Sequence, residues 1–240
     1  MIPAYFDSLR QTPAELYRLF ATDVLMPGDA VVTFNYDMAL DRELRRAGRW
    51  SIGEGYGFGI GDPSFGDSPC KLLKLHGSVN WLGQLFQGKS GIGQVDPANL
   101  SLGERPIIDR SSFEYLGYTN MSDPLEGRNG PVIQSLIMPT AKKRFFEETS
   151  SGRQWESFWD CLWRQARKAL RASSEVYLIG YSVPEHDGRA REMIATSVEA
   201  GVAIRVCCRG GTADVINALK RLGHTEVYSA CATDFEDWVS

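Results

Sequence analysis

One stretch, Ala30–Phe34, constrains the fold most, because every residue in it is apolar or β-branched. A short run of this kind without polar alternation is typical of a strand buried on both faces of a parallel sheet. Asn35 and Asp37 follow it and precede a helix that the apolar spacing predicts over 38–47. Ligands of open α/β sheets bind beyond the carboxyl ends of the strands, so these two polar side chains lie where chemistry is expected.

Asn35 and Asp37 also have a structural interpretation. Asn and Asp are preferred helix N-caps, where a side-chain oxygen accepts a hydrogen bond from an unpaired backbone N–H. Taken alone, the stretch favours capping over catalysis. The functional interpretation therefore depends on the motifs found elsewhere in the chain.

Two further stretches carry such motifs. Leu72–Ser78 is predicted as a strand ending in Lys-Leu-His-Gly-Ser, and Gly180–Asp187 reads Gly-Tyr-Ser-Val-Pro-Glu-His-Asp after another predicted strand. Together with the Thr-Phe-Asn-Tyr-Asp of 33–37, they resemble the motifs of the sirtuin-like family of NAD-consuming domains found in bacterial proteins. The three motifs stand in the order of that family and span most of the chain.

The other predicted elements alternate along the chain. Helices are expected at 11–26, 155–170, 190–198 and 215–222, and strands at 132–138, 175–182, 202–208 and 225–229. This alternation predicts an α/β fold with a doubly wound parallel sheet, which the resemblance makes Rossmann-like and sirtuin-type. We expect a single domain over 1–240 with an irregular insertion at about 83–130, and a flexible or hairpin-like loop at the glycine-rich 53–61.

Charge and cysteine usage exclude some classes of function. A net charge of −4 and a pI near 5.5 give no basic footprint for nucleic acid or an anionic membrane. No apolar run approaches the about 20 residues that span a bilayer, and the N-terminal region does not resemble a signal peptide, so a cytoplasmic location is expected. The five cysteines form no C-x-x-C pair, which predicts reduced thiols and no metal site.

The resemblance implies cleavage of the bond between nicotinamide and ribose in NAD. This bond breaks through an oxocarbenium-like transition state, and an imidazole that is neutral near pH 7 is a natural base for activating the nucleophile. By resemblance, His76 is that base, Asn35 holds the ribose and the attacking water, and Asp37 contacts the carboxamide. A plain strand-end histidine is the alternative interpretation of His76.

The resemblance also implies which residues bind the rest of NAD. Gly180 and Ser182 would meet the phosphates, and the turn at Arg209-Gly210 would lie near the adenosine. A hydroxyl beside a helix N-terminus suits a phosphate, although a strand-to-helix turn capped by Ser182 or Asp187 explains the same residues. The resulting set of NAD-binding candidates is Thr33, Gly180, Ser182, Asp187, Arg209 and Gly210.

Two features of the family are missing from this sequence. Residues 1–26 contain no glycine, so the Gly-Ala-Gly-x-Ser turn that cradles the pyrophosphate is absent. Three explanations stay open: the turn lies upstream, a partner chain supplies it, or the chain is a reduced relative that binds NAD poorly. No cysteine lies between Cys70 and Cys161, which excludes the four-cysteine zinc lobe of sirtuin deacylases and disfavours deacylation.

Two functions follow as hypotheses. The first is an NAD glycohydrolase that needs no metal, which family analogy connects with bacterial anti-phage defence. The second is a non-catalytic nucleotide-sensing or assembly module of the same fold. By the same analogy, the chain is expected to work as a homo-oligomer or with a partner chain.

Overall fold

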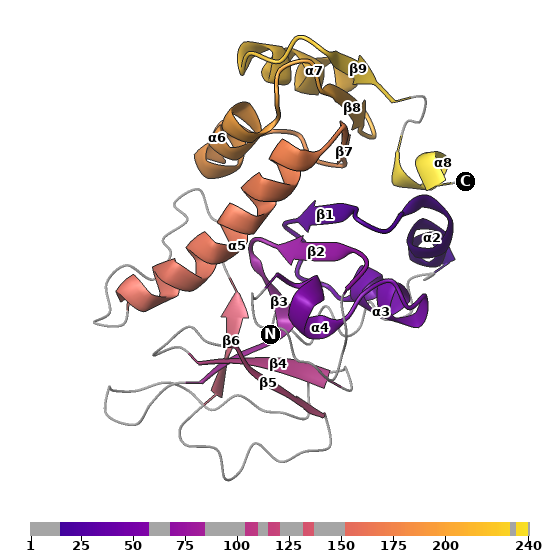
Figure 1. Ribbon diagram of the computed structural model, residues 1–240. Coiled ribbons are helices and arrows are strands. Elements are labelled where there is room, and N and C mark those ends of the chain that lie inside the picture. Colours follow the sequence, from indigo (N-terminus) through magenta and orange to yellow (C-terminus); the bar gives the residue numbers. More distant parts are fainter. Residues whose placement is uncertain are drawn as a thin grey trace. The chain divides into compact units, whose positions relative to one another are not determined.

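The computed structural model describes residues 15–57, 68–84, 104–109, 115–120, 132–136, 152–230 and 234–239. The chain divides into two compact units, Met1–Trp163 and Arg164–Ser240. Its described strands form three sheets, two of them wholly parallel and one mixed (Figure 1). The structure is therefore a mixed α/β arrangement, as predicted, whereas one doubly wound sheet in a single domain stays a prediction.

The described part of the first predicted helix is helical and changes its pitch. It consists of α2 (Glu15–Leu19) and a π-helical turn, η2 (Phe20–Val24). The wider turn is closed by the Leu25 N–H, which donates to the Phe20 carbonyl at 3.0 Å. Leu25 is extended, so the helix ends before Pro27-Gly28, as predicted.

A two-stranded parallel sheet follows, formed by β1 (Ala30–Thr33) and β2 (Lys71–Lys74). The two arrows run side by side in Figure 1. The predicted burial of β1 on both faces is wrong: Ala30 is exposed and the other three residues are partly exposed. Among the described strands β1 pairs with β2 alone, whereas β2 is buried from Leu72 onward.

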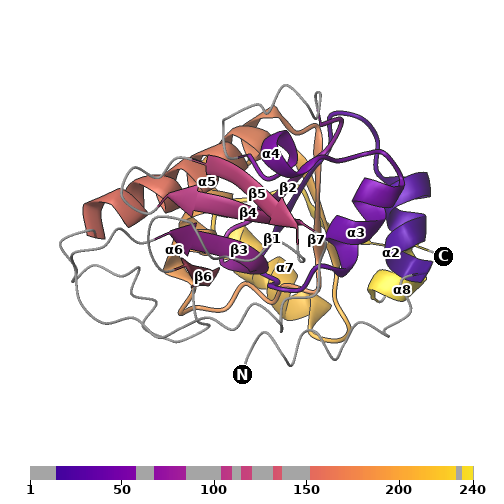
Figure 2. The same ribbon diagram turned by 90° about the horizontal axis from the view of Figure 1, so that it is seen from below.

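Two helices lie between these strands in sequence. Helix α3 (Ala39–Arg46) is close to the predicted 38–47 and packs beside α2 (Figure 2). The glycine-rich segment is not a loop throughout, because it begins with the helical turn α4 (Ile52–Gly55). The residue after this turn, Tyr56, is fully buried. Its ring makes edge-to-face contacts with Trp50 and Trp81, at centroid distances of 4.6 and 5.1 Å. The loop prediction for 58–61 lies outside the described residues.

The predicted strand 72–78 is divided in two. β2 ends at Lys74, and Gly77, with φ of 90°, begins β3 (Gly77–Gln84) in a new direction. The second sheet has the order β5-β4-β3-β6, in which β3 pairs parallel with β4 and antiparallel with β6. Its other strands are β4 (Glu104–Asp109), β5 (Tyr115–Asn120) and β6 (Val132–Leu136).

This mixed sheet corrects two expectations. The described parts of 83–130 are strands, so the insertion is not irregular throughout. Isoleucine, tyrosine and threonine in 104–120 favour strands, although the runs are too short for their periodicity to be recognised. The strand predicted at 132–138 is present as β6, but it is antiparallel to its neighbour.

The long helix α5 (Gly152–Ala172) begins in the first unit and ends in the second. The second unit then alternates between strands and helices, as the sequence predicts as far as residue 229. Its elements are β7 (Glu175–Ile179), α6 (Gly188–Ser197), β8 (Ala203–Cys207), α7 (Thr212–Arg221), β9 (Val227–Ser229) and α8 (Phe235–Val239). All three strands are parallel, in the order β7-β8-β9.

The core of the second unit lies on one face of its sheet. Val176, Ile204 and Val227 are aligned across the three strands and pack with apolar residues of α6 and α7. The opposite face carries Tyr177, whose ring centroid lies 5.1 Å from that of Trp238 in α8. In the described part of the chain, no helix is both long enough and apolar enough to cross a membrane.

Gly55 offers a test of the packing around Tyr56. A Cβ atom at this position would lie 2.0 Å from Nε1 of Trp50, whose ring is buried. Gly55→Ala should therefore force the aromatic cluster apart and lower the free energy of unfolding by about 1–3 kcal/mol, measured by urea denaturation. Gly188→Ala is the matched control, because nothing lies within 4 Å of its added methyl group and alanine favours the helix. Equal stability of the two variants would contradict this packing.

Candidate functional site

The first two sequence motifs meet at the carboxyl end of the β1–β2 sheet. Thr33 and Lys74 are the last paired residues, and the Leu75 N–H donates to the Thr33 carbonyl at 2.9 Å. Asn35 and His76 each follow this register pair by two residues, in parallel strands that run in the same direction. The structure thus brings together the main catalytic candidates of the first unit at one edge of one sheet.

The segment between β1 and α3 is held by local hydrogen bonds. The Asn35 backbone N–H donates to Oγ1 of Thr33 at 3.1 Å, and the Asn35 side chain is exposed. Asp37 is partly buried, and its Oδ1 accepts a hydrogen bond from the Ala39 N–H at 3.0 Å. The Asp37 carboxylate thus accepts the N–H of the first residue of α3, although the N-cap itself is Met38, whereas the exposed Asn35 amide can meet a ligand.

His76 lies beneath aromatic rings. His76 is only 5% exposed. Its ring centroid lies 4.8 Å from that of Phe34 and 6.3 Å from that of Tyr36, which is stacked on it. These contacts fix the plane of the imidazole and remove most of its water.

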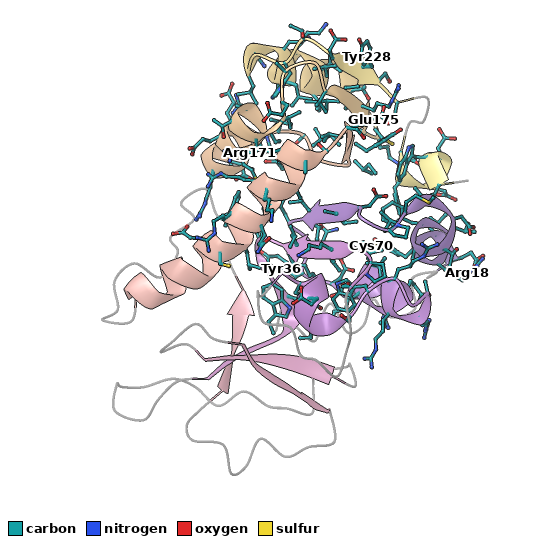
Figure 3. The ribbon with its side chains drawn as sticks, in the orientation of Figure 1. Arg18, Tyr36, Cys70, Arg171, Glu175 and Tyr228 are labelled. Carbon is teal, nitrogen blue, oxygen red and sulfur yellow. The ribbon has the colours of Figure 1, made fainter. Side chains whose placement is uncertain are left out.

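The backbone carbonyls of Tyr36 and Asp37 both accept hydrogen bonds from side chains of the second motif. Ser78 Oγ donates to the Tyr36 carbonyl at 3.3 Å, and the Lys74 ammonium donates to the Asp37 carbonyl. Figure 3 draws the side chains around the labelled Tyr36. The segment that carries Asn35 is consequently anchored by the segment that carries His76.

A buried polar network lies behind this backbone. Lys74 is 1% exposed, and its Nζ lies 3.1 and 3.0 Å from the two carboxylate oxygens of Asp41, itself 3% exposed. The Tyr56 hydroxyl donates to Asp41 and accepts a hydrogen bond from Nδ2 of Asn80 at 3.1 Å. Burial, and next the charge of Asp41, raises the pKa of Tyr56 well above its ordinary value, which keeps this hydroxyl a donor.

This network was missed by the sequence analysis. The sequence does contain a signal, because Lys74 interrupts the apolar run Leu72-Leu73 and Leu75, and a buried lysine requires a charged partner. Its partner Asp41 is not recognisable, since acidic residues on a helix are normally solvated. The glycine-rich segment likewise gives no sign that Tyr56 is buried against Asp41.

The remaining NAD-binding candidates lie at the carboxyl edge of the second unit's sheet. Gly180 has φ of 64° and donates from its N–H to the Cys207 carbonyl at 2.8 Å. Ser182 is exposed beyond it. Asp187 is 5% exposed and accepts a hydrogen bond from the Tyr181 hydroxyl at 3.0 Å, so its carboxylate has a structural partner.

Arg209 and Gly210 follow the neighbouring strand β8 at the same edge. Gly210 and Gly211 have φ of 85° and 69°, and Thr212 Oγ1 donates to the Cys208 carbonyl at 3.2 Å as α7 begins. Arg209 is exposed and donates to Oδ2 of Asp234 at 3.1 and 2.9 Å. The structure thus gathers Gly180, Ser182, Arg209 and Gly210 at one sheet edge of the second unit, and Asn35, Asp37 and His76 at one edge of the first.

Comparison with known proteins adds no assignment: the chain matches no protein-family model and no curated protein. In the described part of the chain, no cluster of three or more His, Cys, Asp or Glu side chains could hold a metal ion. Four cysteines there are free thiols, and Cys70, Cys207 and Cys208 are buried.

The cover over His76 can be tested by titration. Burial raises the pKa of Tyr36 to about 12. Because the folded state favours the neutral phenol, its contribution to stability is complete below the ordinary pKa of about 10 and is lost as the pH rises from there through about 12. We expect the difference in 295 nm absorbance between wild type and Tyr36→Phe to show one phenol ionising near pH 12. Ionisation of that phenol near pH 10 would mean that Tyr36 is not packed on His76.

Proposed function

We propose that this chain is an NAD glycohydrolase of the sirtuin-like type. The observation that carries the proposal is the placement of Asn35 and His76 at equivalent positions past two hydrogen-bonded parallel strands. The carboxyl edge of a parallel sheet is where α/β proteins bind ligands, and an amide and an imidazole at one such edge are suited to orienting and activating water. The finer fold, a doubly wound Rossmann-like sheet of sirtuin type, is part of this proposal.

The reaction would consume NAD and water and release nicotinamide, ADP-ribose and a proton. As nicotinamide leaves, positive charge develops on the ribose, and water adds to the anomeric carbon. His76 would accept the proton from that water or from a ribose hydroxyl, and Asn35 would hold the ribose and the water. Asp37 would face the carboxamide with the carboxylate that the Ala39 N–H orients.

The second unit would offer a phosphate-binding edge of its own. Gly180 and Ser182 stand before α6, and the Arg209-Gly210 turn stands before α7, so free backbone N–H groups and helix dipoles favour phosphates at this edge. Thr33 would support the ribose end from β1. The Asp187 carboxylate would hold the loop through Tyr181 and not touch a phosphate. No metal takes part in the proposed reaction, and the setting would be the cytoplasm.

A non-catalytic nucleotide-sensing or assembly module is the second candidate. One observation favours it, which is the 5% exposure of His76 beneath Phe34 and Tyr36. Such a module would bind NAD without turnover, as a homo-oligomer or with a partner chain that supplies the glycine-rich turn. Isothermal calorimetry with NAD, beside the turnover assay, separates the two functions.

The enzyme is tested by following nicotinamide and ADP-ribose chromatographically with purified protein and NAD. His76→Ala should lower the rate about 10²–10⁴-fold, because the general base is lost. Asn35→Ala should abolish measurable turnover as well, since the attacking water is no longer oriented.

His186→Ala is the matched control, because that histidine is exposed in the second unit and should leave turnover unchanged. Turnover by wild type that survives in His76→Ala would refute the assigned base. Binding of NAD with no turnover in any preparation would favour the sensing module.

A further inference from the structure

The Lys74–Asp41 pair is the most deeply buried charge pair among the described residues, and the proposed reaction gives it no role. Both side chains are at most 4% exposed. Three acceptors surround Nζ of Lys74: the two oxygens of Asp41 and the carbonyl of Asp37. A lysine ammonium has three donors, so its hydrogen-bonding capacity is used completely.

The third acceptor, the Asp37 carbonyl, connects the Lys74–Asp41 pair to the candidate site. Asp41 lies in the first turn of α3, beyond the segment that carries Asn35. Lys74 connects that carboxylate to a backbone carbonyl two residues past Asn35. With Ser78 on the Tyr36 carbonyl, two successive peptide groups are held from the strand ends on either side of His76.

The orientation of the pair is itself specified. The Tyr56 hydroxyl donates to Oδ1 of Asp41, an oxygen that Lys74 also contacts, and Asn80 in β3 donates to Tyr56. A carboxylate held by two donors cannot rotate away from the ammonium without leaving a buried group unpaired. The grip on the Asp37 carbonyl is therefore rigid.

We propose that Lys74 is a positioning residue, which holds the Asn35–Asp37 backbone through the Asp37 carbonyl and so sets Asn35 against the edge that carries His76. This inference rests on the proposed function for its catalytic consequence. Its structural half, the grip on the backbone, stands independently of the substrate.

The decisive variant is the double substitution Lys74→Met and Asp41→Asn. It removes both buried charges together, keeps an acceptor for Tyr56, and avoids the unpaired carboxylate that would unfold Lys74→Met alone. Because methionine cannot donate to the Asp37 carbonyl, the backbone should loosen in a protein that remains folded. Lys71→Met is the matched control, since Lys71 lies in the same strand and is only partly buried.

Hydrogen exchange measures directly how firmly Lys74 holds the Asn35–Asp37 backbone. The Asn35 and Ala39 amides, which donate to Thr33 and Asp37 side chains, should exchange at least about 10-fold faster in the double variant. The Leu75 amide, which donates to the Thr33 carbonyl, should keep its protection because the sheet is intact. Unchanged exchange at Asn35 and Ala39 would overturn the inference.

Turnover of NAD then separates positioning from stability. A displaced Asn35 should lower kcat roughly 10–100-fold with a much smaller change in KM, because substrate contacts are retained while the attack geometry is lost. Full kcat in a double variant with wild-type melting temperature would overturn the catalytic role. If wild type releases no nicotinamide, the proposed function fails and the exchange result alone decides whether Lys74 grips the backbone.

Discussion

A buried ammonium ion organises the first unit. Removing Lys74 and Asp41 from water costs several kcal/mol for each ion, and their attraction offsets this cost only where further hydrogen bonds complete both groups. The Asp37 carbonyl completes the ammonium and the Tyr56 hydroxyl completes the carboxylate. Loss of one partner alone would cost about 3–5 kcal/mol, a large part of the stability of a domain. The folded state is therefore restricted to arrangements in which β2, α3 and the glycine-rich turn meet at one place.

The same constraint explains why polar side chains that contact the preceding motif alternate with buried leucines in and beside the Lys-Leu-His-Gly-Ser motif. Lys74, His76 and Ser78 contact the Phe34–Asp37 segment, whereas Leu73 and Leu75, which flank Lys74, are fully buried. Gly77, with φ of 90°, allows the chain to turn between the histidine and the serine. The motif thus holds the preceding motif in place and also carries His76, the base of the proposed reaction.

Local sequence predicted the elements whose signals are local, and failed where distant residues decide. The β7–β9 unit was predicted closely, since each strand is an apolar run and each helix ends at a glycine or turn. Exposure of β1 depends on which strands lie beside it, which its own residues do not encode. Asp37 makes a local hydrogen bond of the kind that the capping alternative predicted, because its oxygen accepts the Ala39 N–H, but the N-cap of α3 is Met38. The Lys74–Asp41–Tyr56 network joins residues far apart in sequence, so only Lys74 within its apolar run gave any sign of it.

The contrast between Asn35 and His76 has a chemical meaning for the proposed reaction. Asn35 is exposed and would meet the ligand first, whereas the imidazole is shielded by Phe34 and by a stacked, partly exposed Tyr36. A shielded base experiences stronger electrostatic interactions, and water activated beside it does not exchange freely with solvent. Access would require the Tyr36 ring to rotate about its side-chain bonds. Because Ser78 and Lys74 hold the carbonyls of Tyr36 and Asp37, that ring can turn while the backbone carrying Asn35 stays in place.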